Sequence, residues 1–180
     1  MVSQPQNPVH NSARLFLALV PGEDVRAAVV RHRDQWRWNK GEAQYAPQDW
    51  HVTLHFIGSV ARHRLDELCA GLHAPITPFD LHFGRPELWS RGLAVLCPTD
   101  MPEVLRQLHS RLGQDLQRLG LQADSRPYRP HITLARHAQE ALLPPTQPTF
   151  VWHVADYALM ESTGQAHQRY RVVHQYRTAP

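Results

Sequence analysis

Two segments of this chain carry the same pattern, eighty residues apart: His51-Val52-Thr53-Leu54-His55-Phe56-Ile57-Gly58 and His131-Ile132-Thr133-Leu134-Ala135-Arg136. Both begin with histidine, an apolar residue, threonine and leucine. The alternation of polar and apolar residues predicts a β-strand in each copy, because side chains on a strand point to opposite faces in turn. Each strand then has an apolar face for the core and a His/Thr face free for chemistry.

The repeat supplies two imidazoles, each with a hydroxyl two residues away. One imidazole can take a proton from an attacking water while the other gives a proton to a leaving oxygen, which is what a metal-free acid/base phosphodiesterase needs. One His-x-Thr tripeptide is common by chance, but a pair with matching apolar residues, each in a predicted strand, is a specific signal. We therefore predict His51 and His131 to be catalytic. The same alternation places His55 on the His/Thr face, where we expect it at the rim of the site.

Two alternatives start from the same residues. His51 and His55 have the i, i+4 spacing of a helical zinc motif, but the glutamate is missing, neither repeat holds Asp or Glu, and the segment is predicted as a strand. We therefore expect no metal and no cofactor. A non-catalytic RNA-binding module would keep a basic cleft but is expected to lose one catalytic residue, and both motifs are complete. Chelation by EDTA tests the first alternative, and turnover tests the second.

The bulk properties are those of a soluble globular protein. The chain has 180 residues, 42% hydrophobic and 19% charged, with a formal net charge of +3 and a pI of about 9.2. Its cations are scattered, unlike those of a nucleic-acid coat protein. The longest apolar run, Leu15–Val20, is too short to span a bilayer. Residues 1–12 lack the pattern of a signal peptide and are predicted to be a flexible tail, so we expect a cytoplasmic protein with no membrane partner, and a monomer.

Hydrophobic periodicity predicts a mixture of helices and strands. Helices are expected at 23–36, 61–73 and 101–119, and strands at 14–20, 51–58, 77–83, 92–97, 131–136, 149–160 and 168–176. The order lacks the regular βαβ rhythm of a doubly wound sheet, and no glycine-rich phosphate loop follows a strand. We predict an α+β fold whose two lobes are related by approximate duplication.

The two motifs give the chain a resemblance to a known family. It resembles the 2H phosphoesterase superfamily, which is defined by two H-x-[ST]-x motifs, and within it the bacterial and archaeal RNA 2′,3′-cyclic phosphodiesterases, also described as 2′–5′ RNA ligases. Their motifs read HxTLxFLG and RPHxTLAR, and residues 51–58 and 129–136 match them almost throughout. The resemblance extends over residues 13–176, with further landmarks at Arg14–Leu19, Leu88-Trp89, Met160–Ser162 and Tyr170. This chain departs from the family pattern before Leu88 and around Gly164, and it has a histidine at position 55, where the family usually has another residue.

The resemblance implies the fold and the reaction. Residues 13–180 would form a single bilobal 2H phosphoesterase domain, in which two pseudo-twofold-related antiparallel sheets, flanked by helices, present their His-x-Thr strands across a central cleft. The implied reaction is hydrolysis of RNA 2′,3′-cyclic phosphate ends to 2′-phosphates. In it, His131 would activate water and His51 would protonate the 3′ oxygen, with Thr53 and Thr133 holding the phosphate. The reverse reaction, 2′–5′ ligation, would exchange the roles of the two histidines.

Three further residues are candidates for binding substrate. Arg136 could pair with phosphate or stack on a base, although its parity along the strand points away from His131, so a bend must intervene. Phe16 and Tyr128 are candidate base-stacking residues, and a core position is the alternative for Phe16. RNA ends, including those of transfer-RNA halves, and small cyclic nucleotides all present the same five-membered phosphate ring, so either class could be the substrate.

Overall fold

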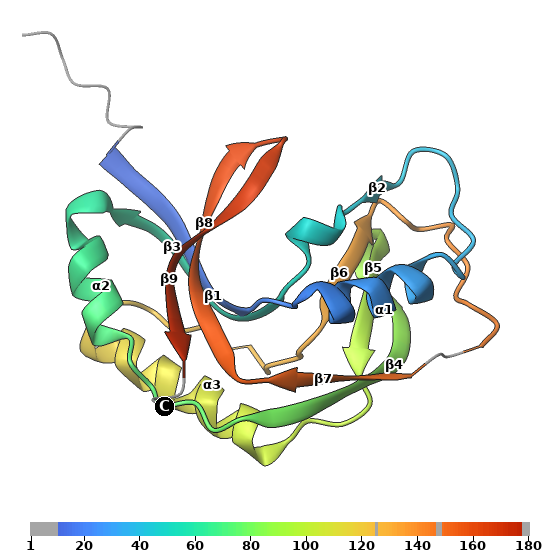
Figure 1. Ribbon diagram of the computed structural model, residues 1–180. Coiled ribbons are helices and arrows are strands. Elements are labelled where there is room, and N and C mark those ends of the chain that lie inside the picture. The colour runs from blue at the N-terminus through green and yellow to red at the C-terminus, as the bar shows by residue number, and fades with distance from the viewer. Residues whose placement is uncertain (1–10, 125, 147–148, 178–180) are drawn as a thin grey trace, which may run out of the picture.

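The computed structural model describes residues 11–124, 126–146 and 149–177, which form a curled antiparallel sheet with helices on its outside (Figure 1). The strands are β1 (Ser12–Leu19), β2 (Ala43–Gln44), β3 (Val52–Ala61), β4 (Phe79–Trp89), β5 (Leu93–Pro98), β6 (Ile132–Arg136), β7 (Phe150–Val154), β8 (Asp156–Gln165) and β9 (Gln168–Arg177). The helices are α1 (Glu23–Arg33), α2 (Leu65–Gly71) and α3 (Glu103–Arg118), with short 3-10 turns at Pro47–Asp49, Arg62–Arg64 and Ser90–Gly92. The predicted α+β class is confirmed.

The sheet has two four-stranded halves that meet at the two repeat strands. The strand order is β7-β4-β5-β6-β3-β1-β8-β9, with β2 pairing β6 from outside this path. A single residue pair, Val52 with Ile132, joins β3 to β6. Because these two residues occupy the same position in the two motifs, a pseudo-twofold axis passes between them and relates the two halves strand by strand. The resemblance implies two pseudo-twofold-related sheets, and in the structure this pair of residues joins them into one.

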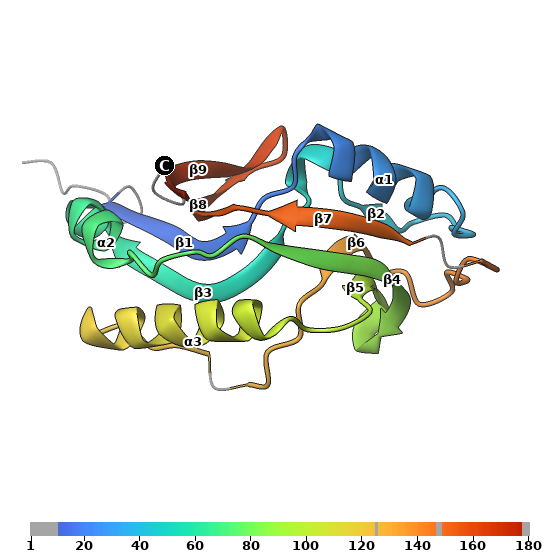
Figure 2. The same ribbon diagram turned by 60° about the horizontal axis from the view of Figure 1, so that its bottom comes forward.

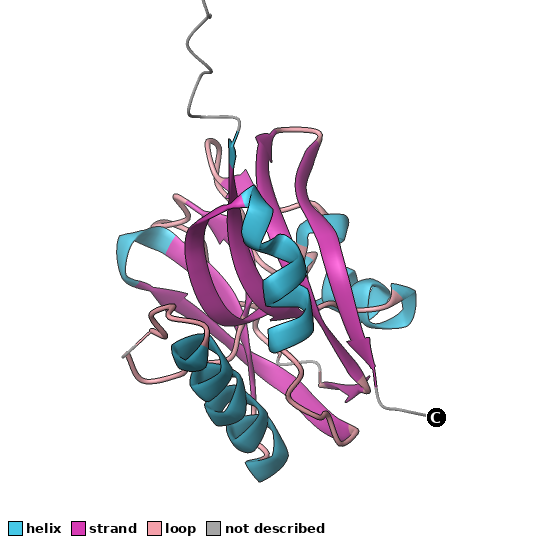
Figure 3. Ribbon diagram, turned by 90° about the vertical axis from the view of Figure 1, so that its left-hand side faces the viewer, coloured by secondary structure: helices cyan, strands magenta, loops and turns pink. Residues whose placement is uncertain are grey.

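The helices cross-link the halves. α1 follows β1 in one half but packs near β7 in the other, and α3 follows β5 but packs along β3 (Figure 2). The buried face of α3 carries leucines at helical spacing: Leu105, Leu108, Leu112 and Leu116. Figure 3 shows the helices on the outside of the magenta strands. Each half therefore depends on a helix from the other to cover its apolar face.

The predicted strand at 149–160 is wrong, because it comprises two strands in different halves. β7 pairs with β4, and β8 pairs with β1, so the chain crosses between the halves at Ala155. Both strands carry a β-type pattern, so periodicity alone does not reveal a change of partner. β3 also continues past Gly58, whose φ of 86° lies in the region that glycine tolerates best.

The predicted tail stays a prediction. Its last residue, Ser12, belongs to β1 and pairs with Ala61. The rest of the predicted tail, residues 1–10, lies outside the described residues. Within the described ranges, the helices are all too short or too polar to cross a bilayer.

Candidate active site

A β-bulge in β3 decides which side chains of the first motif face outward. Thr53 pairs with Ala18 of β1 and His55 pairs with the adjacent Leu17, so Leu54 is one residue in excess. An extra residue shifts the alternation of the following side chains to the opposite face. His55 therefore turns toward the core and Phe56 turns outward.

The second motif contains the same bulge. Thr133 pairs with Val95 of β5 and Ala135 pairs with the adjacent Ala94, which leaves Leu134 in excess. Ala135 is fully buried, and Arg136 is exposed. The bulge thus supplies the bend that Arg136 needs to reach the His/Thr face. The duplication therefore includes an irregularity of the backbone as well as the sequence.

The prediction that His55 lies at the rim of the site is wrong. Its side chain is 2% exposed, its Nε2 lies 2.8 Å from the carbonyl oxygen of His109 on α3, and the two imidazoles stack with ring centres 4.0 Å apart. Because His51 and His55 point to opposite sides of β3, they cannot bind one metal ion together. Among the described residues, no three His, Cys, Asp or Glu side chains are grouped as metal ligands.

A cleft of about 540 Å³ lies over the seam between the two halves. Its lining includes six of the seven predicted site residues: Phe16, His51, Thr53, His131, Thr133 and Arg136. The structure therefore brings both His-x-Thr pairs and the arginine to one cavity. Further lining residues that were not predicted as site residues include Arg14, Tyr45, Phe56, Ser162, Arg169 and Tyr170.

The two histidines are held by matching hydrogen bonds. His51 Nδ1 lies 2.7 Å from the carbonyl oxygen of Asp49, and His131 Nδ1 lies 2.7 Å from that of Arg129. A carbonyl oxygen only accepts, so Nδ1 carries a proton in each ring. Nε2 is then the atom of each imidazole that can take or give a proton.

The walls around the two imidazoles differ. The His51 ring lies 5.0 Å from the Phe16 ring and 4.9 Å from the Tyr170 ring, in an aromatic pocket. Phe16 is only 3% exposed, so it supports the His51 ring and leaves almost no open face for a base.

The wall beside His131 carries charge. Its ring lies 4.5 Å from the Trp89 ring, whose Nε1 donates to the Glu87 carboxylate at 2.5 Å. The Arg129 guanidinium lies over the Trp89 ring at 4.1 Å and pairs with Glu87 at 3.0 Å. His131 is therefore bordered by an ion pair, unlike His51.

These surroundings determine the protonation states of His51 and His131. Burial is the main cause that lowers the pKa of His51 to about 4; the Asp49 carbonyl opposes this effect, and the neighbouring His131 adds to it. Burial also lowers the pKa of His131, Arg129 lowers it as a neighbouring cation, and Glu87 raises it. Both imidazoles are therefore neutral in the empty cleft at pH 7.

One end of the cleft is built around Tyr45. The guanidinium groups of Arg136 and Arg169 lie 5.7 and 5.0 Å from the centre of the Tyr45 ring. Arg169 also lies 3.7 Å from the Asp49 carboxylate.

The sequence carried no signal for Tyr45 or Arg169, because neither belongs to a repeat. Phe56 did have a signal: aligning the two motifs places it opposite Arg136.

Tyr128 is the one predicted site residue that does not line the cleft. Its ring stacks on His109 with centres 4.0 Å apart, and it borders a separate cavity of about 240 Å³. Its hydroxyl has no hydrogen-bond partner among the described residues, and burial raises its pKa. The structure therefore places Tyr128 in a stack with His109 and His55.

Comparison with known proteins agrees with this geometry. The model of the 2′-5′ RNA ligase superfamily matches residues 23–165. An RNA 2′,3′-cyclic phosphodiesterase of Escherichia coli is 31% identical over 167 residues, covering 90% of this chain and 87% of that protein. One from Thermus thermophilus is 31% identical over 163 residues, covering 83% and 81%.

Solved structures show the same fold. A crystal structure described as a phosphoesterase superposes with a TM-score of 0.82 at 25% identity, covering 93% of this chain and 99% of that one. Escherichia coli LigT complexed with NADP+ gives 0.81 at 26% identity, and LigT complexed with 3′-AMP gives 0.79 at 26%, each covering 94% of this chain and 99% of that one. The protein belongs to the 2′-5′ RNA ligase superfamily.

Proposed function

We propose that this protein hydrolyses the 2′,3′-cyclic phosphate at the end of an RNA to a 2′-phosphate without a metal ion. The observation that carries the proposal is that two histidines from duplicated strands line one cleft, each with its Nδ1 held by a backbone carbonyl and its Nε2 free. The similar proteins from Escherichia coli and Thermus thermophilus bear the name of this activity.

The reaction is an in-line displacement at phosphorus. Water forms a new P–O bond on one side while the bond from phosphorus to the 3′ oxygen breaks on the other. One imidazole takes the water proton, and the other delivers a proton to the 3′ oxygen. A pseudo-twofold pair of histidines suits this geometry because it places a base and an acid on opposite sides of the phosphate.

The resemblance assigns the base to His131 and the acid to His51. His131 is neutral at pH 7 because burial lowers its pKa, so it can accept the proton of water. His51 must first gain a proton. The aromatic wall disfavours a protonated His51 in the empty cleft. When a phosphate anion is bound, the same wall strengthens the attraction between the anion and the protonated imidazole, because charges interact more strongly where water is excluded.

Three of the remaining predicted residues would hold the phosphate. Thr53 and Thr133 lie two residues from the catalytic histidines on the same faces, where their hydroxyls can donate to the non-bridging oxygens. Arg136 reaches the cleft through the bulge and can pair with the anion. Phe16 would position the His51 ring.

A small cyclic nucleotide is the second candidate substrate. A cleft of about 540 Å³ falls within the range of small-molecule sites and can hold a single nucleotide. Escherichia coli LigT has been solved in complex with 3′-AMP.

We also propose that the protein acts as a monomer in the cytoplasm, since both catalytic residues come from one chain.

The test is incubation of the purified protein, in EDTA, with an oligoribonucleotide ending in a 2′,3′-cyclic phosphate, followed by chromatography of the product isomers. We expect a 2′-phosphate. A 3′-phosphate would keep the two-histidine mechanism but reverse the leaving oxygen. Loss of activity in EDTA would restore the metal alternative, and absence of turnover on both RNA and cyclic mononucleotides would favour a binding module.

A further inference from the structure

The cleft extends beyond the two histidines along the first half of the sheet. Arg14 of β1, Phe56 of β3 and Ser162 of β8 line it there, and Arg14 and Ser162 are paired neighbours across β1 and β8. We call these three residues the β1 arm. It combines an aromatic ring, a cation and a hydroxyl, and the reaction at phosphorus uses none of them.

Phe56 presents an open aromatic surface in the β1 arm. It is 55% exposed, whereas the ring of its cross-strand partner Phe16, 6.2 Å away, is 3% exposed. The bulge at Leu54 turns Phe56 outward, so its exposure is built into the strand. An exposed aromatic ring on a strand is a usual platform for stacking an unpaired RNA base.

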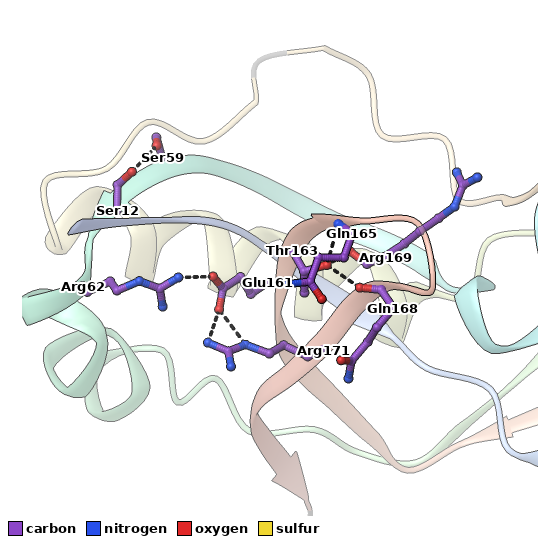
Figure 4. A network of polar contacts seen from close by, with 9 residues as sticks. All are labelled: Ser12, Ser59, Arg62, Glu161, Thr163, Gln165, Gln168, Arg169 and Arg171. Carbon is purple, nitrogen blue, oxygen red and sulfur yellow. Dashed lines mark hydrogen bonds and ion pairs between the residues drawn. The ribbon is translucent and has the colours of Figure 1, made fainter. Parts of the chain in front are cut away.

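Arg14 carries a charge that the protein does not neutralise. It makes no ion pair or side-chain hydrogen bond with any described residue, and it is exposed. The nearest acidic position on β8, Glu161, is already bound by two other arginines, Arg62 at 2.5 Å and Arg171 at 2.6 Å (Figure 4). The guanidinium of Arg14 is therefore available for an anionic ligand.

At the opposite end of the cleft, the charged and aromatic side chains of the protein contact one another. There Arg169 lies beside Asp49 and over Tyr45, which Arg136 also approaches. Figure 4 shows Arg169 extending away from the Glu161 network. Of the two ends, the β1 arm is the one with an open aromatic ring, because Phe56 is exposed and Tyr45 is buried.

The spacing along β1 leaves room for a second phosphate at Arg14. Ala18 pairs with Thr53, and Arg14 lies four residues further along β1, which is roughly 13 Å of strand. Arg14 can therefore pair with a phosphate other than the one that Thr53 holds. Phe56 lies between the two, opposite Phe16.

We propose that the β1 arm binds the terminal nucleotide and the phosphodiester that joins it to the rest of the RNA. The base stacks on Phe56, and the phosphodiester on its 5′ side pairs with Arg14 and accepts a hydrogen bond from Ser162. This inference rests on the proposed function and sharpens it, because it makes an RNA end a better substrate than a nucleoside 2′,3′-cyclic phosphate.

The test compares two substrates that differ by one phosphodiester: adenosine 2′,3′-cyclic phosphate and a dinucleotide ending in the same group. For the wild-type protein we expect kcat/KM to be at least tenfold higher for the dinucleotide. Arg14→Gln is expected to lower the ratio of the two kcat/KM values about tenfold, mainly through KM. Arg14→Lys should restore part of it. Phe56→Ala should lower kcat/KM for both substrates roughly tenfold, because both present a terminal base.

The matched control is Arg111→Gln, an equal loss of charge at an exposed position of α3 outside the cleft, which should leave the ratio unchanged. The dinucleotide KM should also rise more steeply with salt than the mononucleotide KM, and Arg14→Gln should remove that difference. A wild-type protein without preference, or an Arg14→Gln variant with an unchanged ratio, would overturn the β1 arm while leaving the hydrolysis intact. Failure of the wild-type protein on both substrates would instead overturn the proposed function, and the inference with it.

Discussion

The two halves of the sheet hold their histidines in the same way but surround them differently. In both, Nδ1 bonds a carbonyl oxygen two residues earlier at 2.7 Å, and a leucine bulge follows the threonine. Around His51 the wall is aromatic, whereas around His131 it contains the Glu87–Arg129 ion pair. Duplication fixed the geometry of the pair, and the later divergence of the walls gave the two imidazoles different electrostatic settings.

The largest difference from the wild-type protein is expected when either imidazole is removed. We expect His51→Ala and His131→Ala each to lower kcat by about 10²–10⁴-fold, because a general acid and a general base each typically contribute that much. This corresponds to about 3–5 kcal/mol of barrier. The measurement is steady-state turnover on a cyclic-phosphate RNA, with thermal unfolding as a check on folding. His63→Ala, an exposed histidine outside the cleft, is the control; near-normal turnover in either cleft variant would remove that histidine from the mechanism.

The second test removes the matched hydroxyls. Thr53→Val and Thr133→Val keep the shape of the side chain but cannot donate to a phosphate oxygen, so we expect kcat to fall roughly 10²-fold in each. Thr→Ser at the same positions should retain most of the activity. A large loss in one variant and none in the other, measured on the same substrate, would show that only one half holds the phosphate.

Buried histidines on helices α1 and α3 make the stability of the protein depend on pH. Burial lowers the pKa of His32 on α1 to about 4, and burial together with the neighbouring His55 lowers the pKa of His109 on α3 to about 4. An unfolded histidine titrates near 6.5, so between pH 6.5 and 4 the unfolded chain binds more protons than the folded one. The stabilisation is therefore complete above pH 6.5 and is lost as the pH falls toward 4. For fully buried His32 we expect a loss on the order of 2 kcal/mol at pH 5 relative to pH 7, and a smaller loss for half-buried His109.

Urea unfolding at the two pH values measures this loss. A His32→Leu variant should lose less stability on acidification than the wild-type protein. If the free energy of unfolding were the same at pH 5 and pH 7, the neutral buried state of both histidines would be contradicted.

The finest test resolves the two histidines by NMR titration of their ring nitrogens. In the free protein we expect His51 to titrate near pH 4. On addition of inorganic phosphate its pKa should rise, and more than that of His131, because the aromatic wall screens the new ion pair less. A larger rise at His131 would reverse the acid and base roles.

The sequence determined the parts of the site that the duplication repeats. Two His-x-Thr copies with apolar partners predict two half-buried strands, and the seam through Val52 and Ile132 brings them together. The leucines of α3 and the apolar run of β1 are likewise local patterns, so these elements were predicted to within a few residues. Such signals are readable because each depends only on neighbouring residues and the periods of helix and strand.

Only the tertiary structure decided the direction of individual side chains and the pairing of distant strands. The alternation of a regular strand places His55 beside His51, and a single excess leucine turns it into the core and brings Phe56 and Arg136 to the cleft. The crossing at Ala155 and the approach of Arg169 to Tyr45 depend on which strands lie side by side. Bulges and partner changes arise from hydrogen bonding between segments far apart in the chain, so a pattern within one segment does not encode them.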